Sequence, residues 1–231
     1  MKSSTVNLLL FDSRIRNFRK KFYQDVRVEH LSIGHDFDEE AYKGLKFRVL
    51  NIASDHVDME KIQTIISETS YPLRELKVCI ATLVGNLPSI KNAQKLIITG
   101  PLDWFQNATE NRLQRALEHL DNKILEIDVV MMPISDVFRI VEYALKRKHG
   151  IFLIKRRYWD QTKIFEGIRE RFGRKELEIE EEEKDPLCNT EYHTIPMTKI
   201  RHLVVYGILE PSPEIWAHRP GVVMKIVPIT E

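Results

Sequence analysis

The residues that could build a metal or redox site are eight histidines and two cysteines, and none of them stands at ligand spacing. No two histidines lie four residues apart, as in a zinc-binding helix, and no Cys-x-x-Cys occurs. His30 and His202 instead occupy equivalent places, each directly before a leucine. Cys79 and Cys188 cannot make a disulfide framework, which favours a reducing compartment. We therefore expect no metal and no cofactor.

Hydrolytic or nucleotide chemistry has little support in the sequence. Gly-x-Ser-x-Gly does not occur, and Ser135 stands where a helix cap is expected. The loop from Thr99 to Asp103 resembles a phosphate cradle, but it holds no lysine and its proline removes a backbone N–H. A small enzyme on a doubly wound sheet, which is one alternative, would use Thr99, Asp103 and Asp128 at the carboxyl ends of its strands. The interpretation we favour is a protein without catalytic residues.

Basic clusters could contact nucleic acid. They lie at residues 14–21, at residues 146–148 and at Lys155, Arg156 and Arg157. The last cluster is followed by two aromatic residues, so a nucleic-acid-binding protein is a second alternative. However, 35 basic residues almost cancel 34 acidic ones, so no overall field attracts polyanions or a membrane. We expect most of these cations to be solvated surface, and nucleic acid to be an improbable partner.

A short apolar signature, Leu-x-[Ile/Val], recurs along the chain and indicates the strands that would position any site. Its leucines are 19 to 29 residues apart in the first part of the chain. The copies begin at Leu31, Leu50, Leu76, Leu96, Leu125, Leu177 and Leu203, with looser versions at Leu153 and Ile226. Such a period predicts short strands in a repeat protein, in which each unit buries its apolar face against its neighbours.

Helices are predicted between the strands. Their expected N-caps are Asp58, Thr109, Ser135 and Asp160, and the last helix should end at Gly173. An amphipathic helix is also predicted over residues 5–23, ahead of the first repeat. Alternating strands and helices indicate parallel strands.

The spacing favours an α/β, irregular leucine-rich-repeat-like solenoid with helices on the convex side, preceded by a short N-terminal helix. A doubly wound sheet needs longer crossovers, of about 30 residues or more, and strands that are apolar on both faces. The positions between the inward-facing apolar residues are instead mostly polar. They form the expected partner-binding row on the concave strand face: Ser32, Asn51, Lys77, Ile97, Glu126, Glu178 and Val204.

We expect a helical segment at residues 1–24 and the repeat domain at residues 25–231. The apolar stretch at residues 6–11 is too short for a membrane span and has no cleavage pattern of a signal peptide. The expected location is therefore the cytoplasm or the nucleus.

Residues 4–18, Ser-Thr-Val-Asn-Leu-Leu-Leu-Phe-Asp-Ser-Arg-Ile-Arg-Asn-Phe, resemble the second half of an F-box. The irregular strands that follow, a central tryptophan and the helix-bearing connections are similar to the F-box-associated domains of nematode F-box families. The resemblance implies a substrate receptor of an SCF-type ubiquitin ligase that holds a target protein for a separate enzyme.

The same resemblance implies a second set of partners, a Skp-type adaptor and a cullin. The residues that match the apolar F-box helix are Leu8, Leu9, Phe11, Ile15 and Phe18. We expect these side chains either to contact the adaptor or to pack on the first repeat as a cap, because the end of a solenoid exposes an apolar edge.

Overall fold

The computed structural model describes residues 7–10, 26–34, 37, 39–42, 46–54, 59–80, 87–100, 117–129, 132–155, 161–173, 185–188, 190, 192–210 and 219–228. The chain divides into two compact units. Unit 1 comprises Met1–Thr99 and His119–Asn122, and unit 2 comprises Gly100–Glu118 and Lys123–Glu231. The boundary expected after residue 24 lies outside the described residues. No helix in the described ranges is both long and apolar enough to cross a membrane.

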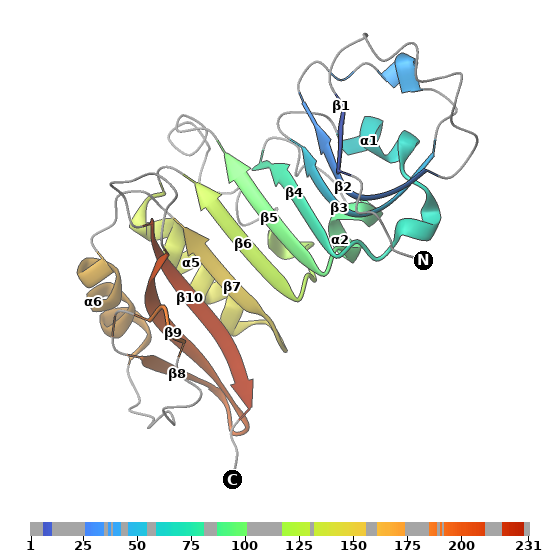
Figure 1. The fold of residues 1–231 in the computed structure, drawn as a ribbon. Helices are drawn as coiled ribbons and strands as arrows, with labels where there is room; N and C mark the ends of the chain where they lie inside the picture. The colour runs from blue at the N-terminus through green and yellow to red at the C-terminus, as the bar shows by residue number, and fades with distance from the viewer. Residues whose placement is uncertain are drawn as a thin grey trace. The chain divides into compact units, whose positions relative to one another are not determined.

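Unit 1 is built on parallel strands that are neighbours in chain order (Figure 1). They are β1 (Asn7–Leu10), β2 (Val26–Ile33), β3 (Phe47–Ser54), β4 (Glu75–Cys79) and β5 (Lys95–Gly100). Each pairs in parallel with the next. The parallel pairing expected of the first four Leu-x-[Ile/Val] copies is therefore confirmed.

The predicted N-terminal helix is wrong at residues 7–10, the part of that segment that the structure describes. Leu8 and Leu9 lie in β1, which adds a strand beside β2, with Leu8 opposite Leu31. Pairing with β2 satisfies the backbone hydrogen-bonding groups of these residues. The spacing of their apolar residues fits a helix as well as a strand, so the spacing alone could not decide between the two. Phe11, Ile15 and Phe18 lie outside the described residues.

Short helices connect the strands of unit 1. They are η2 (Glu39–Tyr42), α1 (Met59–Ile65), η3 (Glu68–Ser70) and α2 (Pro88–Asn92). Helix α1 buries Met59, Ile62 and Ile65, which recur every three residues on one side. The buried Asn122 amide donates to the carbonyls of Ile90 and Ala93, at 2.8 and 2.7 Å. It thereby satisfies two carbonyls at the end of α2.

The core of unit 1 is a row of large apolar side chains in register. It consists of Leu31, Ile52, Leu76 and Leu96, all 0–2% exposed. In β3 Ile52 faces inward as expected, whereas Leu50, which was expected to face inward with it, is only half-buried. In β7 the inward face is displaced by one residue, because Phe152 is buried and Leu153 faces the other way.

Unit 2 combines parallel and antiparallel strands. They are β6 (Ile124–Val129), β7 (Ile151–Lys155), β8 (His193–Thr198), β9 (Arg201–Glu210) and β10 (Arg219–Pro228), in the spatial order β6-β7-β10-β9-β8. β6 and β7 are parallel, whereas β10 is antiparallel to β7 and to β9, and β9 is antiparallel to β8. The expected all-parallel arrangement is therefore wrong in these last three strands. Their connections are too short for the crossover of a dozen or more residues that parallel neighbours need.

Helices α5 (Ile134–Leu145) and α6 (Gln161–Phe172) cover one face of the strands of unit 2. The Tyr143 ring of α5 packs edge-on to Phe152, and the Phe165 ring of α6 stacks on His193. Register connects Phe152 to Met224, Met224 to Val205 and Val205 to His193, so these side chains share a face. The protein is thus a mixed α/β fold.

The predicted helix ends have different outcomes. Helix α5 begins at Ile134 after Pro133, so the expected cap at Ser135 is wrong, and the Asp136 N–H donates to the Pro133 carbonyl. The end at Gly173 is confirmed, because Gly173 has φ +76° and its N–H donates to the carbonyl of Arg169. Asp58, Thr109 and Asp160 lie outside the described residues.

Candidate functional site

The candidate site is a set of polar side chains on one face of the parallel strands of unit 1. His30 of β2 lies opposite Asn51 of β3, Asn51 lies opposite Glu75 of β4, and Glu75 lies opposite Lys95 of β5. Each of these residues directly precedes an inward-facing core residue. Since side chains alternate along a strand, all four point away from the leucine core.

Neighbouring side chains in this row contact each other. The Asn51 amide nitrogen lies 3.2 Å from Nδ1 of His30, and Nζ of Lys95 lies 3.2 Å from a Glu75 carboxylate oxygen. A carboxylate oxygen of Glu29 is 3.8 Å from Nε2 of His30. The His30 side chain is 51% exposed, and those of Lys95 and Glu75 are 30% and 38% exposed. The row is therefore ordered by its own pairs while remaining partly open to solvent.

A second row lies on the same face, two residues further along each strand. Ser32 lies opposite Ala53, Ala53 opposite Lys77, and Lys77 opposite Ile97. Ser32 and Lys77 are half-buried, while Ile97 is 9% exposed. The polar residues of the two rows, His30, Ser32, Asn51, Glu75, Lys77 and Lys95, are called the ladder face below.

The predicted binding row therefore has two outcomes in unit 1. The structure brings Ser32, Asn51, Lys77 and Ile97 to one face, as the alternation predicts. Asn51 and Ile97 are buried, however, so solvent exposure is wrong for these two. Neighbouring side chains cover Asn51, which lies between His30 and Glu75.

In unit 2, the expected solvent-facing positions are wrong. Val204 is 5% exposed and packs with Tyr206, Ile208 and Val223 in a second apolar cluster. Glu126 is also buried, and its carboxylate lies 2.9 Å from Nζ of Lys155. Both residues point to the face opposite Phe152, as alternation predicts, but that face is covered. Glu178 lies outside the described residues.

The segment that covers part of this second cluster is held by tyrosine hydroxyls. Tyr206 donates to a carboxylate oxygen of Asp185 at 2.9 Å, and the Asp185 N–H donates to the Tyr192 hydroxyl at 2.8 Å. The Tyr192 and Tyr206 rings lie 4.7 Å apart. Cys188 donates from its thiol to the Thr190 carbonyl. These contacts explain why Val204 is unavailable as a surface residue.

Unit 2 is expected to lose stability as the pH rises from about 10 to about 12. Burial raises the pKa of Tyr192 to about 12. The pKa of Tyr206 is also raised, mainly by burial and secondly by its hydrogen bond to Asp185. The unfolded chain ionises its tyrosines near pH 10, so the folded state binds more protons between these values and is destabilised as pH rises. Urea unfolding at about pH 9 and about pH 11.5 measures the loss. It should be smaller in Tyr192→Phe, and an equal loss in that variant would contradict the assignment.

The structure does not assemble the alternative sites from the described residues. Asp103 lies outside them, and Thr99 donates its hydroxyl to the Val78 carbonyl. Lys155 is paired with Glu126, while Arg156 and Arg157 lie outside the described ranges. No group of three or more metal-ligating side chains occurs in the described part of the chain.

Sequence reasoning missed His30, Glu75 and Lys95 as members of the site. A signal was available, because the residue before each inward-facing apolar residue is polar in four consecutive strands. We instead took the residue after each leucine, which selects only one row of the face.

A family model described as a domain of unknown function (DUF3557) matches residues 15–151. No curated protein matches the chain, and no solved structure matches it.

Proposed function

The chain belongs to the family of a domain of unknown function, DUF3557, and we propose that it is a protein-interaction module that binds a target protein on the ladder face. The proposal depends chiefly on one observation. Parallel strands are usually buried on both faces, yet here one face carries polar side chains that remain partly exposed, among them His30 and Glu75. A face of this kind can bind a partner and has no need of catalytic residues.

The ladder face suits recognition because its groups are fixed before binding. Strands lie about 4.8 Å apart, so the row from His30 to Lys95 presents three partly exposed side chains, those of His30, Glu75 and Lys95, over about 14 Å. The Lys95–Glu75 and Asn51–His30 contacts restrict these side chains, which reduces the conformational entropy lost on binding. The acidic and basic members stand side by side, so a partner must match an ordered charge pattern.

A narrower proposal is that the module is the target-recognition part of an SCF-type ubiquitin ligase receptor. Its support is the resemblance of the sequence to F-box-associated domains, together with our interpretation of the parallel strands as leucine-rich-repeat-like. Because Leu8 and Leu9 lie in β1, contact with a Skp-type adaptor would depend on Phe11, Ile15 and Phe18. The module would hold the target while a separate enzyme transfers ubiquitin.

A charge swap tests the proposal. The double variant Glu75→Lys with Lys95→Glu keeps an ion pair and the net charge but reverses the pattern of the ladder face. We expect the amount of target captured from cell extract, measured by mass spectrometry, to fall at least about tenfold, because like charges then face each other across the interface. The free energy of unfolding should change by less than about 0.5 kcal/mol.

The matched control is Glu142→Arg with Arg171→Glu, which swaps another exposed ion pair, at 2.6 Å between α5 and α6. This control should capture the same target as the unmodified protein. Recovery of a Skp-type adaptor and a cullin with the unmodified protein and with both swap variants supports the narrower proposal, and failure to recover them rejects it. If the ladder swap captured the same proteins in the same amounts, the ladder face would not be the binding surface.

A further inference from the structure

One end of the strands in unit 2 gathers cations from separate segments of the chain. Their sources are the residue before β6, the turn after α5, the β8–β9 hairpin and the end of β10. We call the following residues the basic edge: Lys123, Lys146, Lys148, Lys199, Arg201 and Lys225. Its members Lys123, Lys146, Lys148 and Lys199 are exposed, whereas Arg201 and Lys225 are half-buried.

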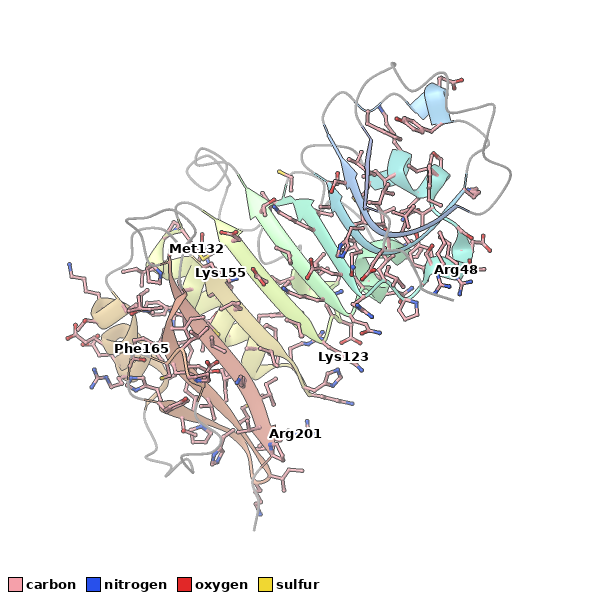
Figure 2. The ribbon with its side chains drawn as sticks, in the orientation of Figure 1. Arg48, Lys123, Met132, Lys155, Phe165 and Arg201 are labelled. Atoms are coloured by element: carbon pink, nitrogen blue, oxygen red, sulfur yellow. The ribbon has the colours of Figure 1, made fainter. Side chains whose placement is uncertain are left out.

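The topology of unit 2 brings these segments together. The Ile151 N–H donates to the Lys123 carbonyl at 2.9 Å, which joins the beginnings of β6 and β7. Lys225 of β10 lies opposite Ile151, and Arg201 of β9 lies opposite Pro228, so the antiparallel strands end and begin at the same place. Figure 2 shows Lys123 and Arg201 at this end of the strands. The β8–β9 hairpin, with Lys199 and Arg201, extends the edge past the start of β7.

The cations of the basic edge differ from several others in the part of the chain that the structure describes. Lys95, Lys155 and Arg171 each pair with a carboxylate. No carboxylate among the described residues pairs with Lys123, Lys146, Lys148, Lys199 or Arg201. Among the described residues, this edge therefore carries a concentrated positive charge, although the protein as a whole is nearly neutral.

Helix electrostatics explain only part of this arrangement. Lys146 and Lys148 follow the C-terminus of α5, where cations are stabilised by the helix dipole. Lys123, Lys199 and Arg201 border strands, which have small net dipoles, so no such effect favours them. We propose that the basic edge binds an acidic segment of a target protein. This inference rests on the proposed function as a protein-interaction module and adds the chemistry of the partner.

An acidic peptide fits the edge better than a nucleic acid. Nucleotide-binding surfaces stack bases on exposed aromatic rings, but the aromatic rings that the structure describes at this edge are already in contact with other side chains. Tyr143 packs against Phe152 and lies under Arg147, and the buried Tyr206 lies under Lys225 and against Tyr192. Ile200 is 62% exposed between Lys199 and Arg201, where it can contact an apolar side chain of a peptide. The edge from β6 to β8 spans about 19 Å, which an extended peptide covers with about six residues.

The test is the affinity of the full chain for a fluorescein-labelled ten-residue peptide of alternating glutamate and serine, measured by anisotropy at low ionic strength. We expect binding that weakens roughly tenfold in the triple variant Lys146→Gln, Lys148→Gln, Lys199→Gln, since exposed ion pairs contribute modestly but add together. The control is Lys61→Gln, Lys91→Gln, Arg169→Gln, which removes three exposed cations from helices elsewhere. Its affinity should equal that of the unmodified protein.

Three results would overturn the inference. They are absence of peptide binding, equal affinity in the two triple variants, and tighter binding of an oligothymidylate of the same charge at the same edge. The Glu75 and Lys95 swap should leave peptide affinity unchanged. If the peptide binds as expected but the swap has no effect on target capture, the proposed binding on the ladder face is rejected and peptide binding at the basic edge is supported. If the swap abolishes capture but the peptide does not bind, only the proposal for the basic edge is rejected.

Discussion

Replacing Lys155 by methionine is expected to lower the free energy of unfolding by about 3 kcal/mol, because the change leaves a buried carboxylate without its cation. Nζ of Lys155 lies 2.9 Å from Oε1 of Glu126, and the two side chains are only 16% and 8% exposed. Lys155 is the last residue of β7 (Figure 2), and its register partner on β6 is Asp128. The substitution thus removes the positive charge from a face that keeps two carboxylates.

The double variant Glu126→Leu with Lys155→Met should recover most of the lost stability. Two apolar side chains of similar size often replace a buried ion pair at little cost, whereas a lone buried charge does not persist without a penalty. Urea unfolding of both variants measures the difference. If the single and double variants were equally unstable, the loss would come from packing of the lysine stem and not from removal of the lysine charge beside Glu126.

Glu126 also shows where sequence reasoning reached its limit. The alternation of side chains along the strand correctly predicts that Glu126 points to the other face of the strand from Leu125 and Ile127. The sequence alone could not show that Lys155, 29 residues later, pairs with it or that this face of the strand is covered. A polar residue between two apolar ones predicts a direction, but whether it meets solvent depends on residues far away in the chain.

The positions of the strands were largely predictable, but in two of them the residues that face the core were not. Leu31, Leu76, Leu96 and Leu125 face inward as expected, and successive strands of unit 1 pair in parallel. In β3 Ile52 faces inward as expected, but Leu50 is only half-buried, and in β7 the inward residue is Phe152, the neighbour of the expected Leu153. Either face of β7 would place apolar residues inward, so the choice there depends on packing across the register.

Strand direction in the last part of the chain was also beyond the sequence pattern. Leu203 and Ile226 are 23 residues apart, a spacing typical of the parallel repeats, yet they lie opposite each other in antiparallel strands. Direction is set by the connection, and residues 211–218 between the two strands are fewer than the dozen or more that a crossover needs. A correct prediction would have required giving this short connection more weight than the period.

A Phe152→Ala substitution is expected to lower the free energy of unfolding by about 4 kcal/mol, because it opens a cavity at the centre of unit 2. Phe152 is 2% exposed and lies in register between Leu125 of β6 and Met224 of β10. Its ring also meets the edge of Tyr143 at 5.7 Å, so it joins α5 to the strands. Gly150 lies so close that an added Cβ would be 3.0 Å from the Phe152 ring, and this approach leaves no space for neighbours to rearrange without cost.

Phe152→Leu is the matched control and should cost about 1.5 kcal/mol, since it retains most of the apolar volume. Leu153→Ala distinguishes the two faces of the same strand. Leu153 is half-buried on the opposite face, so we expect a smaller loss than for Phe152→Ala. Urea or thermal unfolding of the three variants provides the comparison. An equal or larger loss in Leu153→Ala would mean that the main core of unit 2 lies on the face of Val204 and Tyr206, and that α5 and α6 contribute less to stability than their packing indicates.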